Sequence, residues 1–121
     1  MIEDDLRGLL ATGTDIDVYA RLIPMDASEC IVLQEIGGRS STAGIRRNYR
    51  TVSVMACSED RETAGQRMRW SRDYLTENLP SLINGTYYYT AVPLADGTLL
   101  EKRKNGPLYV TFCDMEVASS I

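Results

Sequence analysis

The chain contains no histidine, the commonest general base and the commonest metal ligand in proteins. This absence excludes Ser-His-Asp catalysis, Cys-His catalysis and histidine-based zinc hydrolysis within one subunit. Paired carboxylates are the remaining acid-base candidates, and their spacing offers Asp4 with Asp5, Asp15 with Asp17, and Glu59 with Asp60. Each pair lies at a predicted helix start or turn, where acidic residues are common. The sequence therefore favours structural roles for them and predicts no catalytic centre and no metal site.

An excess of basic residues is also missing. The chain has 13 Lys and Arg against 17 Asp and Glu, for a net charge of −4. This balance argues against a broad duplex-binding surface. Arginines are nevertheless concentrated around one glycine- and serine-rich stretch, at Arg39, Arg46, Arg47 and Arg50. The sequence thus leaves room for a local basic face.

Cysteine is scarce, and no long apolar run is present. Cys30, Cys57 and Cys113 are odd in number and widely spaced, which indicates neither a zinc pattern nor a disulfide framework. We expect buried, reduced thiols and no cofactor. No segment approaches the roughly 20 apolar residues that span a bilayer, and no basic leader precedes an apolar stretch. The expected location is a cytosol, without membrane contact.

The length of 121 residues predicts a single domain, 1–121, with one core. Apolar residues at helical spacing predict a helix over 2–11 and a second helix that begins near Asp60 and ends at Pro80. Alternating or β-rich patterns predict strands over 18–23, 30–36, 48–57, 86–94, 98–102 and 108–117. The first strand is expected at a sheet edge, because Pro24 denies it a further backbone donor.

Several details follow from these patterns. Val52 and Val54 are expected in the core, and Leu82 and Ile83 are expected to pack as the chain turns at Asn84-Gly85. Asp96-Gly97 is typical of a hairpin turn, and Asn105-Gly106-Pro107 of a second turn. The predicted fold class is α+β, with a single mostly antiparallel sheet and two helices packed on one face.

Residues 37–47 form a glycine-, serine- and arginine-rich stretch with only Ala43 and Ile45 to bury, so we expect a loop there. The stretch lacks the Gly-Lys-Ser/Thr ending of a phosphate loop, and a strand follows it in place of a helix, which argues against nucleotide binding. Two interpretations stay open. Either the loop contacts an acidic neighbour or phosphate, or it is a solvated loop.

Three consecutive tyrosines lie in the predicted strand 86–94. Aromatic faces stack on nucleic-acid bases, but strand alternation points Tyr88 away from Tyr87 and Tyr89, so at most two share a face. Core packing with the hydroxyls at the sheet rim is the favoured interpretation.

The order of the motifs resembles one protein family. An N-terminal helix ends in Leu9-Leu10-Ala11, and a strand closes with Arg21-Leu22-Ile23-Pro24. The strand Ile31-Val32-Leu33-Gln34-Glu35-Ile36 runs into Gly37-Gly38, and Val52-Ser53-Val54-Met55-Ala56-Cys57-Ser58 leads into a long helix. Over nearly the whole chain, this order resembles the tail-terminator (tail-completion) proteins of long-tailed bacteriophages. The stretch 37–47 is longer than in the commonest version of that family.

The resemblance implies a non-enzymatic virion protein, assembled in the host cytoplasm, that forms a six-fold ring at the end of the tail tube. Its implied partners are copies of itself, the major tail tube protein and a head-side connector protein, and a transient contact with DNA passing through the ring stays open. It implies that the ring halts tube polymerisation and joins the tail to the head. Because edge strands and unordered loops need partners, the residues expected at the assembly interface are Tyr19, Arg21, Arg39, Ile45, Arg46 and Arg47.

Two alternatives accompany this interpretation. A head-completion or neck connector protein would cap heads and leave tube length unchanged. A small nucleic-acid-binding module would use the loop arginines and the tyrosines, and its affinity would fall steeply with salt.

Overall fold

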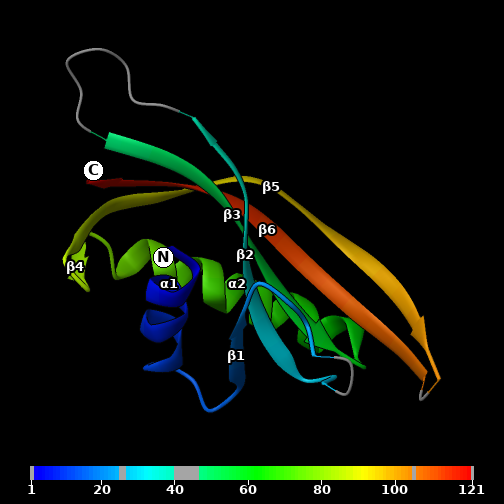
Figure 1. The fold of residues 1–121 in the computed structure, drawn as a ribbon. Coiled ribbons are helices and arrows are strands. Elements are labelled where there is room, and N and C mark those ends of the chain that lie inside the picture. Colours follow the sequence, from blue (N-terminus) through cyan, green and yellow to red (C-terminus); the bar gives the residue numbers. More distant parts are fainter. Residues whose placement is uncertain (1, 25–26, 40–46, 105, 121) are drawn as a thin grey trace.

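The computed structural model describes residues 2–24, 27–39, 47–104 and 106–120 (Figure 1). The helices and strands follow one another as α1 (Ile2–Ala11), β1 (Asp17–Ala20), β2 (Cys30–Arg39), β3 (Arg47–Ser58), α2 (Arg61–Glu77), β4 (Ser81–Ile83), β5 (Thr86–Arg103) and β6 (Gly106–Ser120).

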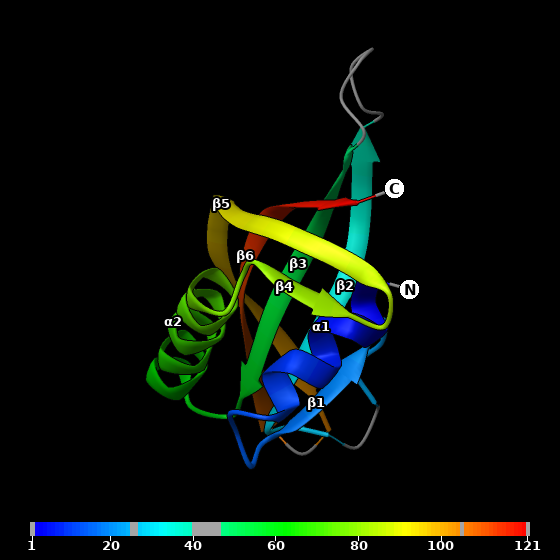
Figure 2. The ribbon, with the colours of Figure 1, turned by 90° about the vertical axis from the view of Figure 1, so that its left-hand side faces the viewer.

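The strands form one mixed sheet in the order β1-β2-β3-β6-β5-β4. β1 runs parallel to β2, and every other neighbouring pair is antiparallel. Figure 2 shows the long strands β2 and β3 crossing the molecule, and the short strands β1 and β4 are the two ends of the sheet order. The predicted α+β class with a mostly antiparallel sheet is confirmed, and so is the position of the first strand at an edge.

Both predicted helices are present. α1 spans the predicted residues, with its acidic first turn intact. α2 begins after Asp60, whose carboxylate accepts hydrogen bonds from the backbone N–H of Thr63 at 2.9 Å and from its hydroxyl at 2.7 Å. This cap satisfies a donor that a helix start leaves unpaired. The helix ends at Glu77, before Pro80, where Asn78 caps it by donating its backbone N–H to the Tyr74 carbonyl.

The larger core cluster contains side chains of both helices and of the central strands. Leu6 and Leu10 of α1 and Leu75 of α2 are at most 1% exposed. Burying one such leucine contributes roughly 1.5–3 kcal/mol. Their strand neighbours in this cluster include Ile31, Leu33, Val52, Val54, Cys113, Met115 and Val117. The prediction that Val52 and Val54 are in the core is confirmed.

A second, smaller cluster consists of Cys30, Val32, Cys57, Leu108 and Val110. Ile23 and Ala27, from the connection between β1 and β2, pack against it. Arg103 joins this connection to the end of β5 by donating from Nη1 to the Ala27 carbonyl at 2.6 Å. The three cysteines are free and buried, as predicted.

The predicted hairpin at Asp96-Gly97 is wrong. β5 is a single strand of 18 residues that runs through both the predicted stop at Pro93 and the predicted turn. β6 pairs with β5 as far as Arg103, and one irregularity between Pro93 and Ala95 absorbs the disruption. Proline is tolerated there because β5 is an edge strand beyond its short pairing with β4. The reversal occurs near Gly106, which has a φ of +121°; Asn105 lies outside the described residues.

The loop predicted over 37–47 is too long at both ends. Gly37, Gly38 and Arg39 belong to β2, and Arg47 belongs to β3, because the two strands keep pairing up to Arg39 opposite Tyr49. Residues 40–46 lie outside the described part of the chain.

Two smaller predictions also need correction. The first strand ends at Ala20 and not at Ile23, because Arg21 adopts a φ of +78° that breaks the extended backbone. Leu82 does not pack: it is 67% exposed on the edge strand β4, whereas Ile83 packs against the core. The turn at Asn84-Gly85 is confirmed by the positive φ of both residues. Within the described residues, no helix has the length and apolar character needed to cross a bilayer.

Candidate assembly surfaces

The predicted interface residue Tyr19 lies on the edge strand β1. Its ring is half-buried against the second cluster, and its hydroxyl donates to Asp17 Oδ2 at 3.4 Å. The outer side of β1 has no neighbouring strand in the described sheet. This side of β1 is therefore a sheet edge, where a strand of another chain can add.

Arg21 anchors α1 to this edge. Its Nη2 lies 2.7 Å from Asp4 Oδ2, and its Nε lies 3.7 Å from Glu3 Oε1. Its backbone N–H donates to the Leu33 carbonyl at 2.8 Å. These contacts hold the arginine in its left-handed conformation, so its main visible role is within the subunit.

Two more predicted residues, Arg39 and Arg47, lie where β2 ends and where β3 begins. The backbone of Arg39 pairs with Tyr49, and that of Arg47 pairs with Ser120. The guanidinium of Arg47 lies 4.3 Å from the centroid of the Tyr89 ring, a cation–π contact. Ile45 and Arg46 lie outside the described residues. The structure thus separates the described part of the predicted interface into two groups, one at β1 and one where β2 ends and β3 begins (Figure 1).

Sequence reasoning missed the longest open edge. β4 pairs only with Tyr87, Tyr88 and Thr86 of β5, so the outer side of residues 90–103 has no strand neighbour in the described sheet. We call residues 90–103 the β5 edge and residues 15–22, which include β1, the β1 edge. The erroneous turn at Asp96-Gly97 hid this edge, because it divided β5 into two short strands.

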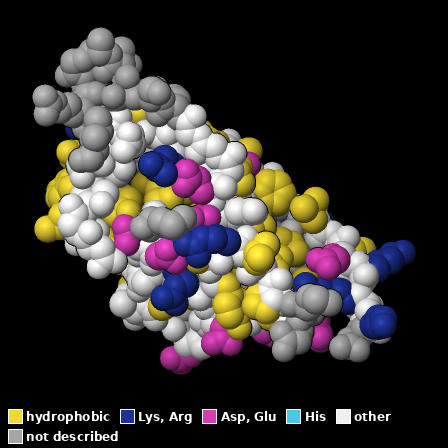
Figure 3. Space-filling model, in the orientation of Figure 1, with side chains coloured by type: hydrophobic (Ala, Val, Ile, Leu, Met, Phe, Trp, Pro, Cys, Tyr) yellow, Lys and Arg dark blue, Asp and Glu magenta, His cyan; other side chains and the backbone are white. Residues whose placement is uncertain are grey.

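The exposed large hydrophobic side chains lie at the margins of the sheet. In the described residues they are Leu22, Ile36, Leu82, Tyr87, Val92, Leu94, Leu99 and Leu100. Leu22 lies in the β1 edge, and Ile36 lies on β2 beyond its pairing with β1. The remaining six lie on β4 and β5. Figure 3 shows hydrophobic side chains gathered where β5 and β6 run. Grouped exposed apolar residues are typical of contact surfaces.

The β5 edge presents leucines to both faces of the sheet. Leu99 lies opposite Val110, and Leu100 lies opposite Tyr109. Because neighbouring strand residues point to opposite faces, the two leucines project on different sides. They are 61% and 53% exposed.

Side chains of opposite charge are exposed at one end of each edge. Lys102 and Lys104 are exposed at the end of β5, where Figure 3 shows basic side chains projecting from the hairpin. Asp15 and Asp17 are exposed at the start of the β1 edge. Within the described part of the chain, none of these four side chains forms an ion pair.

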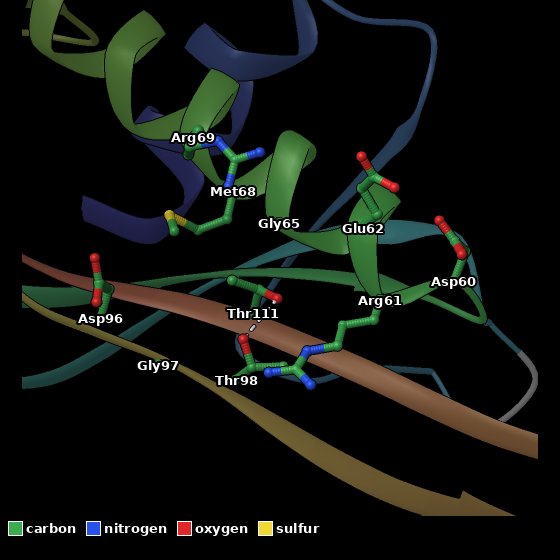
Figure 4. Close-up of a pocket in the computed structure, with 10 residues that line it drawn as sticks. All are labelled: Asp60, Arg61, Glu62, Gly65, Met68, Arg69, Asp96, Gly97, Thr98 and Thr111. Carbon is green, nitrogen blue, oxygen red and sulfur yellow. Dashed lines mark hydrogen bonds between the residues drawn. The ribbon is translucent and has the colours of Figure 1, made fainter.

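A groove of about 620 Å³ lies between the first half of α2 and the strands β5 and β6. Figure 4 shows Arg61, Gly65 and Met68 on the helix side and Asp96 and Thr98 on the strand side. The hydroxyls of Thr98 and Thr111 lie 3.3 Å apart on its floor. The groove is open and carries charges of both signs, so its chemistry selects no particular ligand.

The buried acidic residues of α1 are satisfied within the fold. Asp5 accepts hydrogen bonds from the Tyr88 hydroxyl and from Asn84 Nδ2. Glu3 accepts from the backbone N–H of Glu35 at 3.2 Å. Burial, together with the contact with Asp5, raises the pKa of Tyr88 above its usual range. These groups therefore fasten α1 to the sheet.

The remaining buried polar side chains of the described residues are also paired. In the described residues, no buried side-chain nitrogen or oxygen lacks a hydrogen-bond partner. Among the described residues, no three Cys, Asp or Glu side chains lie close enough together to hold a metal ion. A comparison with protein-family models found no match, and a comparison with curated proteins found none either.

Proposed function

We propose that this chain is a structural subunit that assembles with copies of itself into a ring of the tail-terminator kind. In this role the ring caps the tail tube of a long-tailed phage, ends its polymerisation and joins the tail to the head. One face of the ring contacts the major tail tube protein, and the other contacts a head-side connector protein. The virion is its final location.

The observation that carries this proposal is the position of the exposed apolar residues. In the described sheet, β1 and most of β5 lack an outer neighbour. Six of the eight exposed large hydrophobic side chains of the described residues lie on β4 and β5, and Leu22 lies in the β1 edge. Two different contact edges on opposite sides of one subunit suit a head-to-tail interface. Such an interface forms a ring when the rotation from copy to copy brings the last copy back to the first. The sequence resemblance supports the same role.

We further propose that both helices cover one face of the sheet. Leu6 of α1 and Leu75 of α2 belong to one cluster with Val54 and Met115 of the central strands. In the ring, the helices then cover one side of a continuous layer of strands, and the edges remain free for neighbouring copies.

Tube length in an infected culture tests the function directly. Lysates of a phage lacking this gene are compared by electron microscopy with lysates in which the wild-type chain is supplied in trans. We expect tail tubes of uncontrolled length and unjoined filled heads without the chain, and both defects repaired with it. Tubes of normal length beside unjoined heads would contradict tail termination and favour the neck connector.

The assembly state is measured on the purified protein. Size-exclusion chromatography with light scattering, run alone and with tail tube protein, should give a ring, expected to be a hexamer. Negative-stain images should show the ring on tube ends. A chain that remains monomeric in both samples contradicts the proposal.

A further inference from the structure

The directions of the strands fix how two copies can be joined. β1 is parallel to β2, and the antiparallel pairs β2–β3, β3–β6 and β6–β5 follow across the sheet. β5 therefore runs opposite to β1. When a second copy is placed beside the first without being turned over, the β5 edge of one copy meets the β1 edge of the next in antiparallel orientation. Antiparallel strands exchange pairs of backbone hydrogen bonds.

We infer that the ring is built by this pairing, in which the β5 edge of each copy adds to the β1 edge of its neighbour and the sheet continues from one subunit to the next. The inference rests on the proposed function, since it names the contact that makes the ring. Its occupant is a second copy of this chain. Backbone hydrogen bonds supply the join, and side chains at the edges select the partner.

Charge complementarity supports this pairing. In antiparallel alignment, the end of β5 that carries Lys102 and Lys104 lies beside the start of the β1 edge, with Asp15 and Asp17. These four side chains are exposed. Opposite charges at the rim of an interface speed association and select the correct neighbour.

The apolar residues fit the same alignment. Leu99 and Leu100 precede the basic end of β5, and Leu22 follows the acidic start of the β1 edge. The antiparallel directions therefore bring the leucines of one copy toward Leu22 of the other. Leu22 is 76% exposed, so the subunit's own core leaves it uncovered. The pairing removes apolar surface of both copies from water.

A symmetric dimer that joins two β5 edges is the main competing arrangement. It would be isologous, so each edge would face an identical one. That dimer leaves Leu22, Asp15 and Asp17 without a role and gives Lys102 and Lys104 no acidic partner from the β1 edge. Head-to-tail pairing uses both edges, and we therefore favour it.

A charge swap tests the inference. One variant carries Lys102→Glu with Lys104→Glu, and a second carries Asp15→Lys with Asp17→Lys. A control carries Arg61→Glu with Arg69→Glu on α2, which changes the net charge as much as the first variant but lies outside both edges. Circular dichroism and urea unfolding verify that each variant folds. Association is measured by analytical ultracentrifugation over a concentration series.

The inference predicts that each edge variant associates at least about tenfold more weakly than wild type, because attraction at every contact becomes repulsion. The control should associate like wild type. An equimolar mixture of the two edge variants should recover assembly. Alternating copies restore opposite charges at every contact: the reversed β5 edge meets the reversed β1 edge, and the two unchanged edges meet each other.

The possible results separate the inference from the proposed function. If wild type forms rings but the mixture associates no more strongly than each variant alone, the proposed strand pairing is wrong and ring formation still holds. A wild-type dimer whose association is unchanged by the β1-edge substitutions would identify the isologous β5 pair. This result overturns the inference. Wild type that stays monomeric with and without tail tube protein overturns both.

Discussion

The hydroxyl of Tyr88 on β5 donates a hydrogen bond to Oδ2 of Asp5 in the first turn of α1, across a separation of 83 residues. Asn84 completes the site by donating from Nδ2 to Oδ1 of the same carboxylate at 2.8 Å. Tyr88 is 2% exposed, and Asp5 is 5% exposed. The contact therefore ties the N-terminal helix to a strand from the last third of the chain, and both of its side chains are buried.

Removal of the Tyr88 hydroxyl should destabilise the fold. Tyr88→Phe keeps the ring in the core but leaves one oxygen of a buried carboxylate without its donor. We expect a loss of about 1–3 kcal/mol in the free energy of unfolding, measured with urea. Tyr87→Phe is the matched control, because that neighbouring ring is 36% exposed, and its change should stay within about 0.5 kcal/mol. Equal losses in both variants would show that the contact with Asp5 contributes nothing.

The same tyrosine predicts a dependence on alkaline pH. Burial first, and then the contact with Asp5, raise the pKa of Tyr88 in the folded chain, while in the unfolded chain it titrates near 10. Above about pH 10 the unfolded state loses this proton and the folded state keeps it, so stability falls as the pH rises. The decline between pH 9.5 and 11 should be steeper for wild type than for Tyr88→Phe. Parallel stability curves would refute this assignment.

Local patterns predicted the elements that are encoded locally. The N-terminal helix, the start of α2 near Asp60 and its apolar stripe follow from short-range spacing, and the structure reproduces them. The course of β5 does not follow from its own residues. Pro93 and the Asp96-Gly97 pair indicate a break, but β6 supplies hydrogen-bonding partners along nearly all of β5 and outweighs the local preference.

The candidate site was predicted only in part for the same reason. Tyr19 was placed at an edge because Pro24 marks the end of a strand, and β1 is indeed an edge. Leu99 and Leu100 appeared to belong to a short return strand, and nothing in their immediate sequence shows that β5 lacks an outer neighbour beyond Tyr88. Sheet order is a property of the whole fold. The apolar residues Leu94 and Ala95 before Asp96-Gly97, and Leu99 and Leu100 after it, are compatible with one long strand.

Two adjacent glycines in β2 should respond differently to alanine. A Cβ at Gly38 would lie 2.9 Å from the backbone oxygen of Tyr49, whereas a Cβ at Gly37 meets nothing within 4 Å. Gly38→Ala therefore forces β2 and β3 apart and should cost about 1–3 kcal/mol. Gly37→Ala should be neutral or stabilising by up to about 1 kcal/mol, because alanine loses less backbone entropy on folding. Urea unfolding measures both. A harmless Gly38→Ala would mean that the two strands part before this point.

The buried thiols should resist modification until the chain opens. Cys30 lies opposite Cys57 in the β2–β3 pair, and both are fully buried. The hydrogen bond between them raises the pKa of Cys57 and lowers that of Cys30, and burial raises the pKa of Cys113. Lack of access outweighs the lowered pKa of Cys30, since a reagent must reach the sulfur.

A disulfide reagent at pH 8 measures this protection. We expect the native thiols to react at least about a hundredfold more slowly than in urea, at a rate set by opening of the fold. Leu100→Cys, at an exposed position, should add one fast thiol and serves as the positive control. A fast native thiol in the wild-type chain would contradict the buried arrangement.

Glu29 links the start of β2 to the beginning of α2, and its removal should destabilise the fold there. Its carboxylate accepts from the Ser58 hydroxyl at 2.9 Å, from Arg67 Nη1 at 2.9 Å and from the backbone N–H of Glu59 at 3.0 Å. Because the side chain is 46% exposed, we expect Glu29→Ala to cost only about 1 kcal/mol. Glu29→Gln keeps the shape and one acceptor oxygen, so it should cost less.

Acid titration distinguishes the charge of Glu29 from its shape. Partial burial opposes ionisation, but the hydrogen bonds from Glu59, Ser58 and Arg67 outweigh it and hold the pKa below its usual value. A lowered pKa in the folded state means that the stabilisation is complete above the unfolded pKa, near 4.5, and disappears as the pH falls through the folded value. The stability difference between wild type and Glu29→Gln should therefore be constant from pH 7 to about pH 5 and shrink below about pH 4. A difference that persists unchanged at pH 3 would show that the carboxylate acts through its shape and not through its charge.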